Sequence, residues 1–374
     1  MSGENLSALQ LVLSGDPELF AIVLLSLEVS LSAVLLAALI GIPFGAVIRN
    51  SDNETMEIIV ADNGSTDDSV SHIKDAFPSV KIIQLKKNYG FAEGYNLALK
   101  QVDAEYFILL NSDVEVTPHW IEKGMKLFDQ NPKVAVVQPK ILSFEKSHLF
   151  EYAGAAGGFI DKFGYPFCRG RILNQMEADT SQYNHITPIF WASGACMFIK
   201  SHAFREAGGF DEVFWAHMEE IDLCWRLKSL GYEIWYQPES VVFHLGGGTL
   251  SYGNPQKIYL NFRNNLFMLF KNLPRYQFKR IFLIRMILDF VAAVKFILGF
   301  HYKGFWSVLK AHASFYRNLP DLIRKRKETQ GKIKVKEHRE IYPKSIMWKF
   351  FIQKKRKFSE LNFEIKTNPE SLKK

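Results

Sequence analysis

The chain has 374 residues, of which 48% are hydrophobic and 23% charged, and its formal net charge is +7. This mixture is typical of a globular protein with a buried core, and it excludes a wholly disordered chain. Cys168, Cys196 and Cys224 lie far apart without a CxxC pair, which argues against a disulfide framework or a zinc site. Residues 324–357 contain 14 Lys or Arg against 3 Glu, so the basicity belongs to a C-terminal tail.

Residues 1–55 form an N-terminal segment with a long apolar stretch. Its last 20 residues, 29–48, are uncharged and are long enough to cross a hydrocarbon core of roughly 30 Å. We therefore predict a transmembrane helix at about residues 19–48, with Arg49 favouring a cytoplasmic position for the rest of the chain. The alternative is a buried helix of a soluble core, because Glu28 interrupts the longer run. The stretch also resembles the first membrane span of ABC-transporter permease subunits.

From residue 56 onward, apolar runs alternate with amphipathic segments. Such alternation of strands and helices is typical of an α/β fold with a doubly wound, mostly parallel sheet. We expect strands at about 57–61, 80–84, 106–111 and 134–137, and helices at about 70–77, 90–100 and after Pro118.

The strand at 107–110 runs directly into Asn111, Ser112 and Asp113. Ligands of open α/β sheets bind outside the carboxyl ends of the strands, so we predict that Asp113 holds a metal ion or a phosphate group. The alternative is that this acid caps the next helix.

Six sequence motifs appear in order between about residues 56 and 250: ADNGSTDDS, KNYGFAEGYNLAL, LLNSDVEV, WASGACMFIK, GGFDEVFWAHMEEIDLCWRLKSLGY and HLGGGTL. Together they resemble family 2 glycosyltransferases of the GT-A fold, especially the rhamnosyltransferase-like branch that decorates bacterial surface polysaccharides. The resemblance implies a GT-A domain at residues 56–255. It also implies inverting transfer of a sugar, possibly rhamnose, from a nucleotide-diphosphate donor to a polysaccharide or glycolipid acceptor.

The resemblance also implies roles for individual residues. A divalent cation, Mg²⁺ or Mn²⁺, would neutralise the departing diphosphate, and Mg²⁺ is often held by only one or two carboxylates. The residues implied for the cation are Asp113, Asn111 and His244, and Asn111 replaces a carboxylate found in many relatives. The residues implied for the nucleotide are Asp62, Gly90, Asn96 and Ser112. The alternative for Asp62 is a role in an Asx turn. The alternative for His244 is that it is a strand-end residue without function.

The three acidic residues before LCWR, Glu219, Glu220 and Asp222, do not all lie on one face of the expected helix. Glu219 and Asp222 share a face of the expected helix, whereas Glu220 points about 100° away. The resemblance places Glu220 where the general base stands, and a base there would take the proton of the attacking hydroxyl. The alternative is a solvated acidic helix start. The resemblance assigns Trp191, Gly194, Ala195 and Glu219 to the sugar and acceptor pocket, and core packing is the other interpretation of the tryptophan.

Residues 256–322 are predicted to form membrane-associated helices, because residues 281–300 are apolar but carry three charges and suit a helix lying in the membrane surface. The basic tail, residues 323–374, suits anionic lipid; a merely solvated tail is the alternative. Nucleic acid is not expected as a partner, because no recognition motif accompanies the charge. These predictions place the protein at the inner (cytoplasmic) membrane, with its catalytic domain on the cytoplasmic side.

One expected element is missing. Relatives begin this domain with a strand and a helix before the strand matched by residues 57–61. Residues 44–48 resemble a strand, but a parallel crossover needs a dozen or more residues, and only residues 49–55 separate the two. We therefore expect a GT-A sheet without its usual first strand. A catalytically impaired, membrane-tethered binding module and a permease fragment remain the alternatives to an active enzyme.

Overall fold

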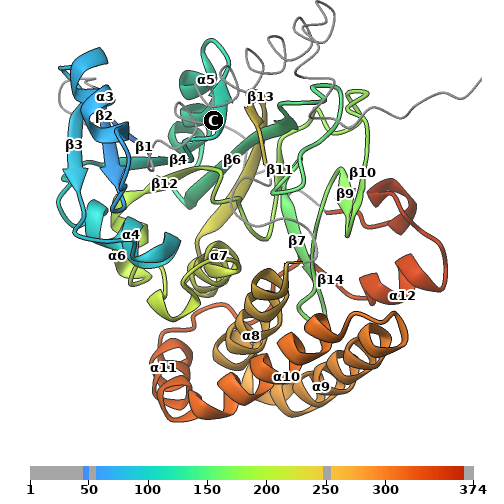
Figure 1. Ribbon diagram of the computed structural model, residues 1–374. Coiled ribbons are helices and arrows are strands. Elements are labelled where there is room, and N and C mark those ends of the chain that lie inside the picture. Colours follow the sequence, from blue (N-terminus) through green and yellow to red (C-terminus); the bar gives the residue numbers. More distant parts are fainter. Residues whose placement is uncertain (1–44, 50–55, 247–253, 366–374) are drawn as a thin grey trace, which may run out of the picture.

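The computed structural model describes residues 45–49, 56–246 and 254–365. They form an α/β body with a nine-stranded sheet, a five-stranded sheet and a group of C-terminal helices (Figure 1). The strands of the first sheet are β1 (Gly45–Arg49), β2 (Met56–Asp62), β3 (Lys81–Gln84), β4 (Tyr106–Leu110), β5 (Val114–Val116), β6 (Val134–Ser143), β11 (Thr187–Pro188), β12 (Cys196–Lys200) and β13 (Glu233–His244). The helices between them are α3 (Ser69–Ala76), α4 (Gly90–Leu99), α5 (Trp120–Gln130), α6 (Ser201–Glu206) and α7 (Glu219–Ser229).

The first sheet is mixed. Its strand order is β11-β13-β6-β12-β4-β1-β2-β3, and β5 pairs with β13. β2, β3, β4, β6 and β13 run in one direction, with β1 and β12 inserted antiparallel among them. Among the described strands of this first sheet, only β2–β3 and β6–β13 pair in parallel. The predicted α/β fold is confirmed, but the prediction of a mostly parallel sheet is wrong.

β1 lies in the central position that the sequence leaves vacant, between β2 and β4. Val47 lies opposite Ile58 of β2 and opposite Ile108 of β4. The first sheet therefore does contain a strand at this place, which corrects the expectation of a missing strand, but the strand is antiparallel to both neighbours. The reason is the length of the connection, because residues 50–55 are too few for a parallel crossover and enough for an antiparallel turn.

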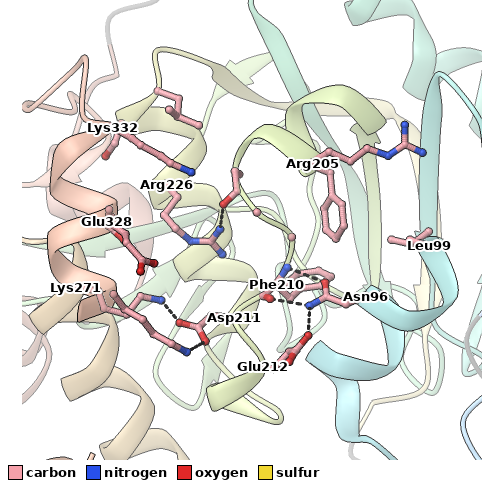
Figure 2. A pocket seen from close by; sticks show the side chains of 18 of the residues that line it. Asn96, Leu99, Arg205, Phe210, Asp211, Glu212, Arg226, Lys271, Glu328 and Lys332 are labelled. Atoms are coloured by element: carbon pink, nitrogen blue, oxygen red, sulfur yellow. Dashed lines mark hydrogen bonds and ion pairs between the residues drawn. The ribbon is translucent and has the colours of Figure 1, made fainter. Parts of the chain in front are cut away.

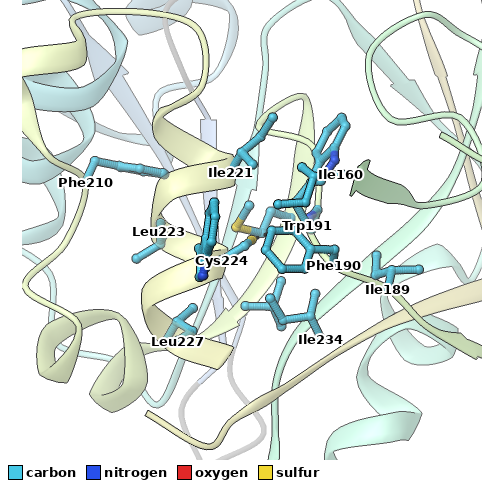
Figure 3. Close-up of a cluster of buried hydrophobic side chains, with 14 of the residues drawn as sticks. Ile160, Ile189, Phe190, Trp191, Phe210, Ile221, Leu223, Cys224, Leu227 and Ile234 are labelled. Atoms are coloured by element: carbon cyan, nitrogen blue, oxygen red, sulfur yellow. Dashed lines mark hydrogen bonds between the residues drawn. The ribbon is translucent and has the colours of Figure 1, made fainter. Parts of the chain in front are cut away.

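β4 is buried on both faces of the sheet. Phe107 and Leu109 belong to one apolar cluster and Ile108 to the other, as expected for alternating side chains of a strand covered on both sides. α5 packs against β6 and β13 on the second face. On the first face, α7 contributes Ile221 and Cys224 to the cluster drawn in Figure 3. β4, whose carboxyl end carries the predicted site, is thus packed against other elements on both faces of the sheet.

The basic segment predicted as a tail is folded onto the protein. Its strand β14 pairs in parallel with β7, and Phe358 packs against Phe159 with ring centroids 5.5 Å apart. Tyr342, Phe350 and Phe358 of this segment are buried, whereas Trp348 and Phe351 are exposed. The second sheet comprises β10 (Gln175–Met176), β9 (Arg171–Ile172), β8 (Pro166–Cys168), β7 (Gly158–Asp161) and β14 (Ile341–Tyr342) in this order.

The C-terminal helices are α8 (Pro255–Asn272), α9 (Arg275–Leu298), α10 (Tyr302–Arg317), α11 (Leu319–Gly331) and α12 (Ile346–Phe351). α8 was predicted to be membrane-associated, but its residues 264–272 are all buried, so α8 is part of the protein core. α9 and α10 are separate helices, since Gly299 ends α9.

The predicted transmembrane helix at about 19–48, with its permease-like stretch, lies almost entirely outside the described residues. Its last residues, 45–48, are in β1, so they belong to the sheet and not to a separate N-terminal segment ending at residue 55. Among the helices of the described ranges, none combines the length and apolar character required to cross a membrane.

Candidate functional site

Asp113 lies just beyond the carboxyl end of β4, as predicted. β5 follows it and pairs with β13, and this pairing places His244 opposite Val114. The Oδ1 atom of Asp113 is 3.2 Å from Nε2 of His244. Burial raises the pKa of Asp113, but the contact with His244 outweighs burial and the pKa is lowered. Asp113 is therefore held as a carboxylate.

Glu151 completes a chain of three charged groups that sequence reasoning missed. Its Oε2 atom lies 3.3 Å from Nδ1 of His244, on the side opposite to Asp113. Burial lowers the pKa of His244, but the two carboxylates outweigh burial and raise the pKa to about 10. Both ring nitrogens of His244 thus face carboxylates, and its role as a metal ligand stays a prediction. No motif in the sequence marks Glu151.

The turn 111–113 offers oxygen atoms for a cation. The side-chain Oδ1 of Asn111 is buried and has no hydrogen-bond partner within the described part of the chain, and Asp113 supplies a carboxylate two residues later. Half-buried Ser112 lies between them. These oxygens fit the small donor set that Mg²⁺ takes from a protein when phosphates supply the rest. The described residues contain no group of three or more His, Cys, Asp or Glu arranged for a metal, so any such site depends on ligand oxygens.

The end of β2 organises the start of α4. Oδ1 of buried Asp62 accepts a hydrogen bond from the backbone N–H of Ser65, three residues on, at 2.9 Å, so its side chain orders the following turn. Asn63 bridges the two segments, since its Nδ2 donates to the carbonyl of Gly90 at 2.9 Å and its Oδ1 accepts from the N–H of Tyr89 at 3.0 Å. Gly90 has φ +75°, and a Cβ there would lie 2.5 Å from the indole of Trp215, so only glycine fits.

Asn96 does not lie with these residues. Its Nδ2 donates to the carbonyl of Phe210 at 2.8 Å, and its Oδ1 accepts from the N–H of Phe210 at 3.0 Å. It lines a cavity of about 510 Å³ together with Phe210 and Lys271 (Figure 2). Phe107, which also lines this cavity, lies at the opposite end of β4 from Asp113. The amide of Asn96 thus joins α4 to the loop before α7, and its role in nucleotide binding stays a prediction. In the same cavity Lys271 forms an ion pair with Asp211.

The turn before α7 is strained and leads to two carboxylates. Trp215, His217 and Met218 all have positive φ, at 63°, 68° and 73°, a conformation that non-glycine residues rarely adopt and that concentrates at functional sites. Glu219 and Glu220 follow at the start of α7. In both, Oε2 is buried and has no hydrogen-bond partner among the described residues.

Glu220 is the more accessible of the two carboxylates. It is half-buried, whereas Glu219 is 4% exposed. Burial raises the pKa of Glu220 to about 7, although the backbone N–H groups at the helix start lower it. Burial and the neighbouring Glu220 raise the pKa of Glu219 well above its usual range. A carboxyl group with a pKa near 7 and a free oxygen atom is suited to proton transfer at neutral pH.

Asp222 has a structural role, as its different position around the helix suggested. Its carboxylate accepts hydrogen bonds from Arg226 Nε at 2.8 Å and from Asn272 Nδ2 at 2.7 Å. Lys271 Nζ lies 3.0 Å away. Asp222 therefore ties α7 to α8, which leaves the start of α7 to Glu219 and Glu220.

The segment 191–195 connects the end of β4 to α7. The carbonyl of Ala195 accepts a hydrogen bond from the N–H of Asn111 at 2.9 Å, and the N–H of Ala192 donates to Cys224 Sγ at 3.4 Å, one helical turn after Glu220. Trp191 is 3% exposed and its indole N–H donates to the carbonyl of Phe159 at 2.9 Å. Trp191 is thus packed in the core (Figure 3), and its assignment to the sugar pocket stays a prediction.

The predicted acceptor-pocket residues Gly194 and Ala195 lie in this connecting segment. A Cβ at Gly194 would come within 2.7 Å of the Phe91 ring, and Ala195 is buried. Their backbone therefore packs between α4 and the end of β4.

Comparison with known proteins shows what this chain is similar to. Residues 44–197 match the model of the family described as "Glycosyl transferase family 2". The chain is 26% identical over 219 residues to an N-acetylglucosaminyl-diphospho-decaprenol L-rhamnosyltransferase of Mycobacterium tuberculosis, with 54% of this chain and 70% of the relative covered. It is 25% identical over 210 residues to rhamnosyltransferase WbbL of Escherichia coli, with 52% and 75% covered. A crystal structure of GalNAc-T7 with UDP, GalNAc and Mn²⁺ aligns with a TM-score of 0.47 at 15% identity, covering 61% of this chain and 44% of that one.

The protein is a glycosyltransferase. The match to the family 2 model covers residues 44–197, which include β1 and are less than half of the chain.

Proposed function

We propose that the protein transfers a sugar from a nucleotide-diphosphate donor to a hydroxyl group of a glycan acceptor, with inversion at the anomeric carbon. The main support for this proposal is the state of the Glu220 carboxyl group. Its carboxyl group combines a pKa near 7 with an unpartnered oxygen atom, and it stands at the start of a helix linked through residues 192–195 to the turn at Asp113. In this proposal Glu220 is the base that single-step displacement requires, and the turn at Asp113 binds the cation.

The side chains of the site have separate tasks. Glu220 accepts the proton of the attacking hydroxyl group. Asp113 and the free Oδ1 of Asn111 would hold a divalent cation, which neutralises charge on the leaving diphosphate when it is bound. His244, held protonated between Asp113 and Glu151, fixes the orientation of the Asp113 carboxylate and places a further positive charge near the turn.

The donor-binding wall is proposed to lie at the ends of β2 and β4. Asp62 is buried at the end of β2, and Asn63 fixes the start of α4 at Gly90. Together with Ser112 these residues would contact the nucleotide, in a domain that we propose to be of the GT-A type. The arrangement follows the rule that α/β sheets bind ligands at the carboxyl ends of their strands.

For the substrates, the names of the relatives suggest a narrower choice. The mycobacterial relative is an L-rhamnosyltransferase that acts on a lipid-linked N-acetylglucosamine, according to its name, and the Escherichia coli relative is also a rhamnosyltransferase. We propose a rhamnosyl donor and a lipid-linked or polysaccharide acceptor, with the protein at the cytoplasmic face of the inner membrane.

Replacement of Asp113 tests the cation and diphosphate site. Asp113→Asn is expected to weaken Mg²⁺- or Mn²⁺-dependent binding of a nucleoside diphosphate by about tenfold or more, because it removes the only formal negative charge of the turn. Isothermal calorimetry of the purified chain with UDP, GDP and dTDP, with and without metal, measures this. Glu122→Gln, at an exposed ion-pair position on α5, is the matched control. Equal, metal-dependent binding by wild type and Asp113→Asn would place the cation elsewhere.

A catalytically impaired binding module is the second candidate, and the direction of β1 favours it. Because β1 is antiparallel to β2 and β4, its first residue, Gly45, lies opposite Val60 and Leu110 near the ligand-binding edge. A parallel strand would place its last residue and the following loop there. The antiparallel β1 therefore brings no such loop to this edge. Nucleotide binding without donor hydrolysis or transfer by the purified chain would support this candidate over the enzyme.

A further inference from the structure

The outward side of α9 is apolar. Leu283, Ile287, Phe290, Val291 and Leu298 are all exposed, with Phe290 at 67% and Leu298 at 75%. Their spacing places them along one stripe of the helix. Isolated exposed apolar residues are ordinary, but a contiguous stripe of large ones marks a contact surface.

The inward side of the same helix is polar at its centre. Arg285 and Asp289 are buried and form an ion pair, with Arg285 Nε 2.8 Å from Asp289 Oδ1. His312 of α10 lies 3.3 Å from the other oxygen of Asp289, and the Arg285 guanidinium stacks 3.8 Å from the ring centroid of Tyr165. At the centre of α9, the charged pair Arg285–Asp289 thus faces the protein and large apolar residues face outward, which is the reverse of the pattern of a helix at a water-exposed surface.

The apolar surface continues past the end of α9 into α10. Phe300 is 80% exposed, and Tyr302, Trp306 and Leu309 are also exposed. α9 and α10 pack against each other and lie side by side at the lower edge of the molecule in Figure 1. We call the exposed residues Leu283, Ile287, Phe290, Val291, Leu298, Phe300, Tyr302, Trp306 and Leu309 the α9–α10 face.

α12 borders this surface. Lys295 Nζ of α9 lies 4.5 Å from the ring centroid of Phe351 in α12. Trp348 and Ile352 beside it are exposed. The segment that was predicted to be a lipid-binding tail therefore meets the α9–α10 face as a folded element.

The charges around the α9–α10 face have one sign. Residues 275–317 contain eight Lys or Arg and a single acid, Asp289, and that acid is buried in its pair with Arg285. Residues 344–357, around α12, contain six Lys or Arg and no acid. Lys303 and Lys310 of α10, which belong to the first of these two groups of basic residues, are exposed. A partner for this surface must be apolar where it meets the stripe and negatively charged around it.

We infer that the α9–α10 face docks onto the surface of an anionic lipid bilayer, with α9 and α10 lying in the plane of the interface. An interfacial helix has an apolar side rich in aromatic residues and Leu, bordered by Lys and Arg, and aromatic residues such as Tyr302 and Trp306 favour the headgroup level. A second copy of the chain fits less well, because two such surfaces would bring like charges together. This inference stands apart from the proposed reaction, since it concerns no residue of the candidate site.

Site-specific labels test which part of the protein meets the lipid. The three native cysteines are buried, so single cysteines introduced by Phe290→Cys, Leu298→Cys or, as a control, Phe77→Cys can be labelled with an environment-sensitive fluorophore. Phe77 is exposed at the end of α3, outside the α9–α10 face. With phosphatidylcholine–phosphatidylglycerol vesicles, the labels at 290 and 298 should shift to the blue and be quenched by a lipid-bound quencher. The label at 77 should not respond.

A second experiment removes positive charges that border the α9–α10 face. Lys303→Gln with Lys310→Gln, in the Phe290→Cys background, should raise the vesicle concentration for half-maximal response about 25-fold, at about fivefold for each charge removed. Pure phosphatidylcholine vesicles should give a much weaker response. The inference is overturned if the labels at 290 and 298 stay in water while the full chain sediments with vesicles, because another segment then makes the contact. It is equally overturned if both labels respond to protein concentration without lipid and light scattering detects a dimer.

Discussion

Glu220→Gln is expected to lower kcat by about 10²- to 10⁴-fold, the usual contribution of a general base. The substitution keeps the shape of the side chain and removes its ability to accept the proton of the acceptor hydroxyl group. Binding of a nucleoside diphosphate should be unchanged, because Glu220 lies on α7 and the proposed cation turn lies at the end of β4. Transfer assays with a rhamnosyl donor, together with calorimetry of nucleotide binding, measure both quantities.

Glu219→Gln on the same helical turn is the matched comparison. Glu219 is 4% exposed, so its loss should affect packing and substrate fit more than proton transfer. If Glu219→Gln abolishes transfer while Glu220→Gln remains active, the base is Glu219. Full activity of Glu220→Gln with normal folding would refute the role of Glu220 as the base.

The same role predicts the pH dependence of transfer. A general base acts only when ionised, and burial raises the pKa of Glu220 to about 7. The ionised fraction grows as the pH rises through that value, so kcat should fall about tenfold per pH unit below it and level off above it. Nucleotide binding, measured over the same range, should lack this step. Glu220 should titrate between about pH 5 and 8. A kcat that stays constant over this range would contradict a base with a raised pKa.

Val47→Pro is expected to destabilise the protein by about 3 kcal/mol or more. Val47 lies in the middle of β1, between Ile58 of β2 and Ile108 of β4. Proline removes the backbone N–H donor and its ring disturbs the ladder, which is tolerated at sheet edges and not in central strands. An unsatisfied buried partner alone costs about 1–3 kcal/mol.

Urea denaturation followed by circular dichroism measures this loss, with Val47→Ile as the control that keeps both the donor and the β-branched side chain. Val47→Ile should shift the midpoint only slightly. Equal midpoints for Val47→Pro and the wild type would mean that the central position of the sheet does not depend on β1, and that the expectation of a transferase sheet without its first strand was right.

Local patterns in the sequence were sufficient for several elements of the site. The run 107–110 predicted a buried strand, and it forms the core of β4 with Asp113 just beyond its end. Its alternating side chains can be recognised without a partner because both faces are apolar. The difference in helical phase between Glu220 and Asp222 also follows from the sequence, and Asp222 indeed has a separate, structural role.

Other features depended on contacts between distant parts of the chain. Trp191 and Asn96 are predicted as binding residues, and the structure adds that the first donates its indole N–H to Phe159 and the second is bonded to Phe210. Glu151 carries no signal in its own neighbourhood and reaches His244 only because β6 and β13 pair. Such roles are set by which segments meet in space, and a motif cannot specify them.

The sequence by itself thus determined the class of enzyme, the buried β4 strand and the positions of Asp113 and Glu220. These depend on local periodicity and on ordered motifs. Only the tertiary structure decided that residues 45–49 fill the central place in the sheet, that the basic segment packs through Phe358, and that α9 turns its apolar side outward. Strand direction, docking of a tail and the choice of buried face all depend on pairing and burial between segments far apart in the chain, which no local pattern encodes.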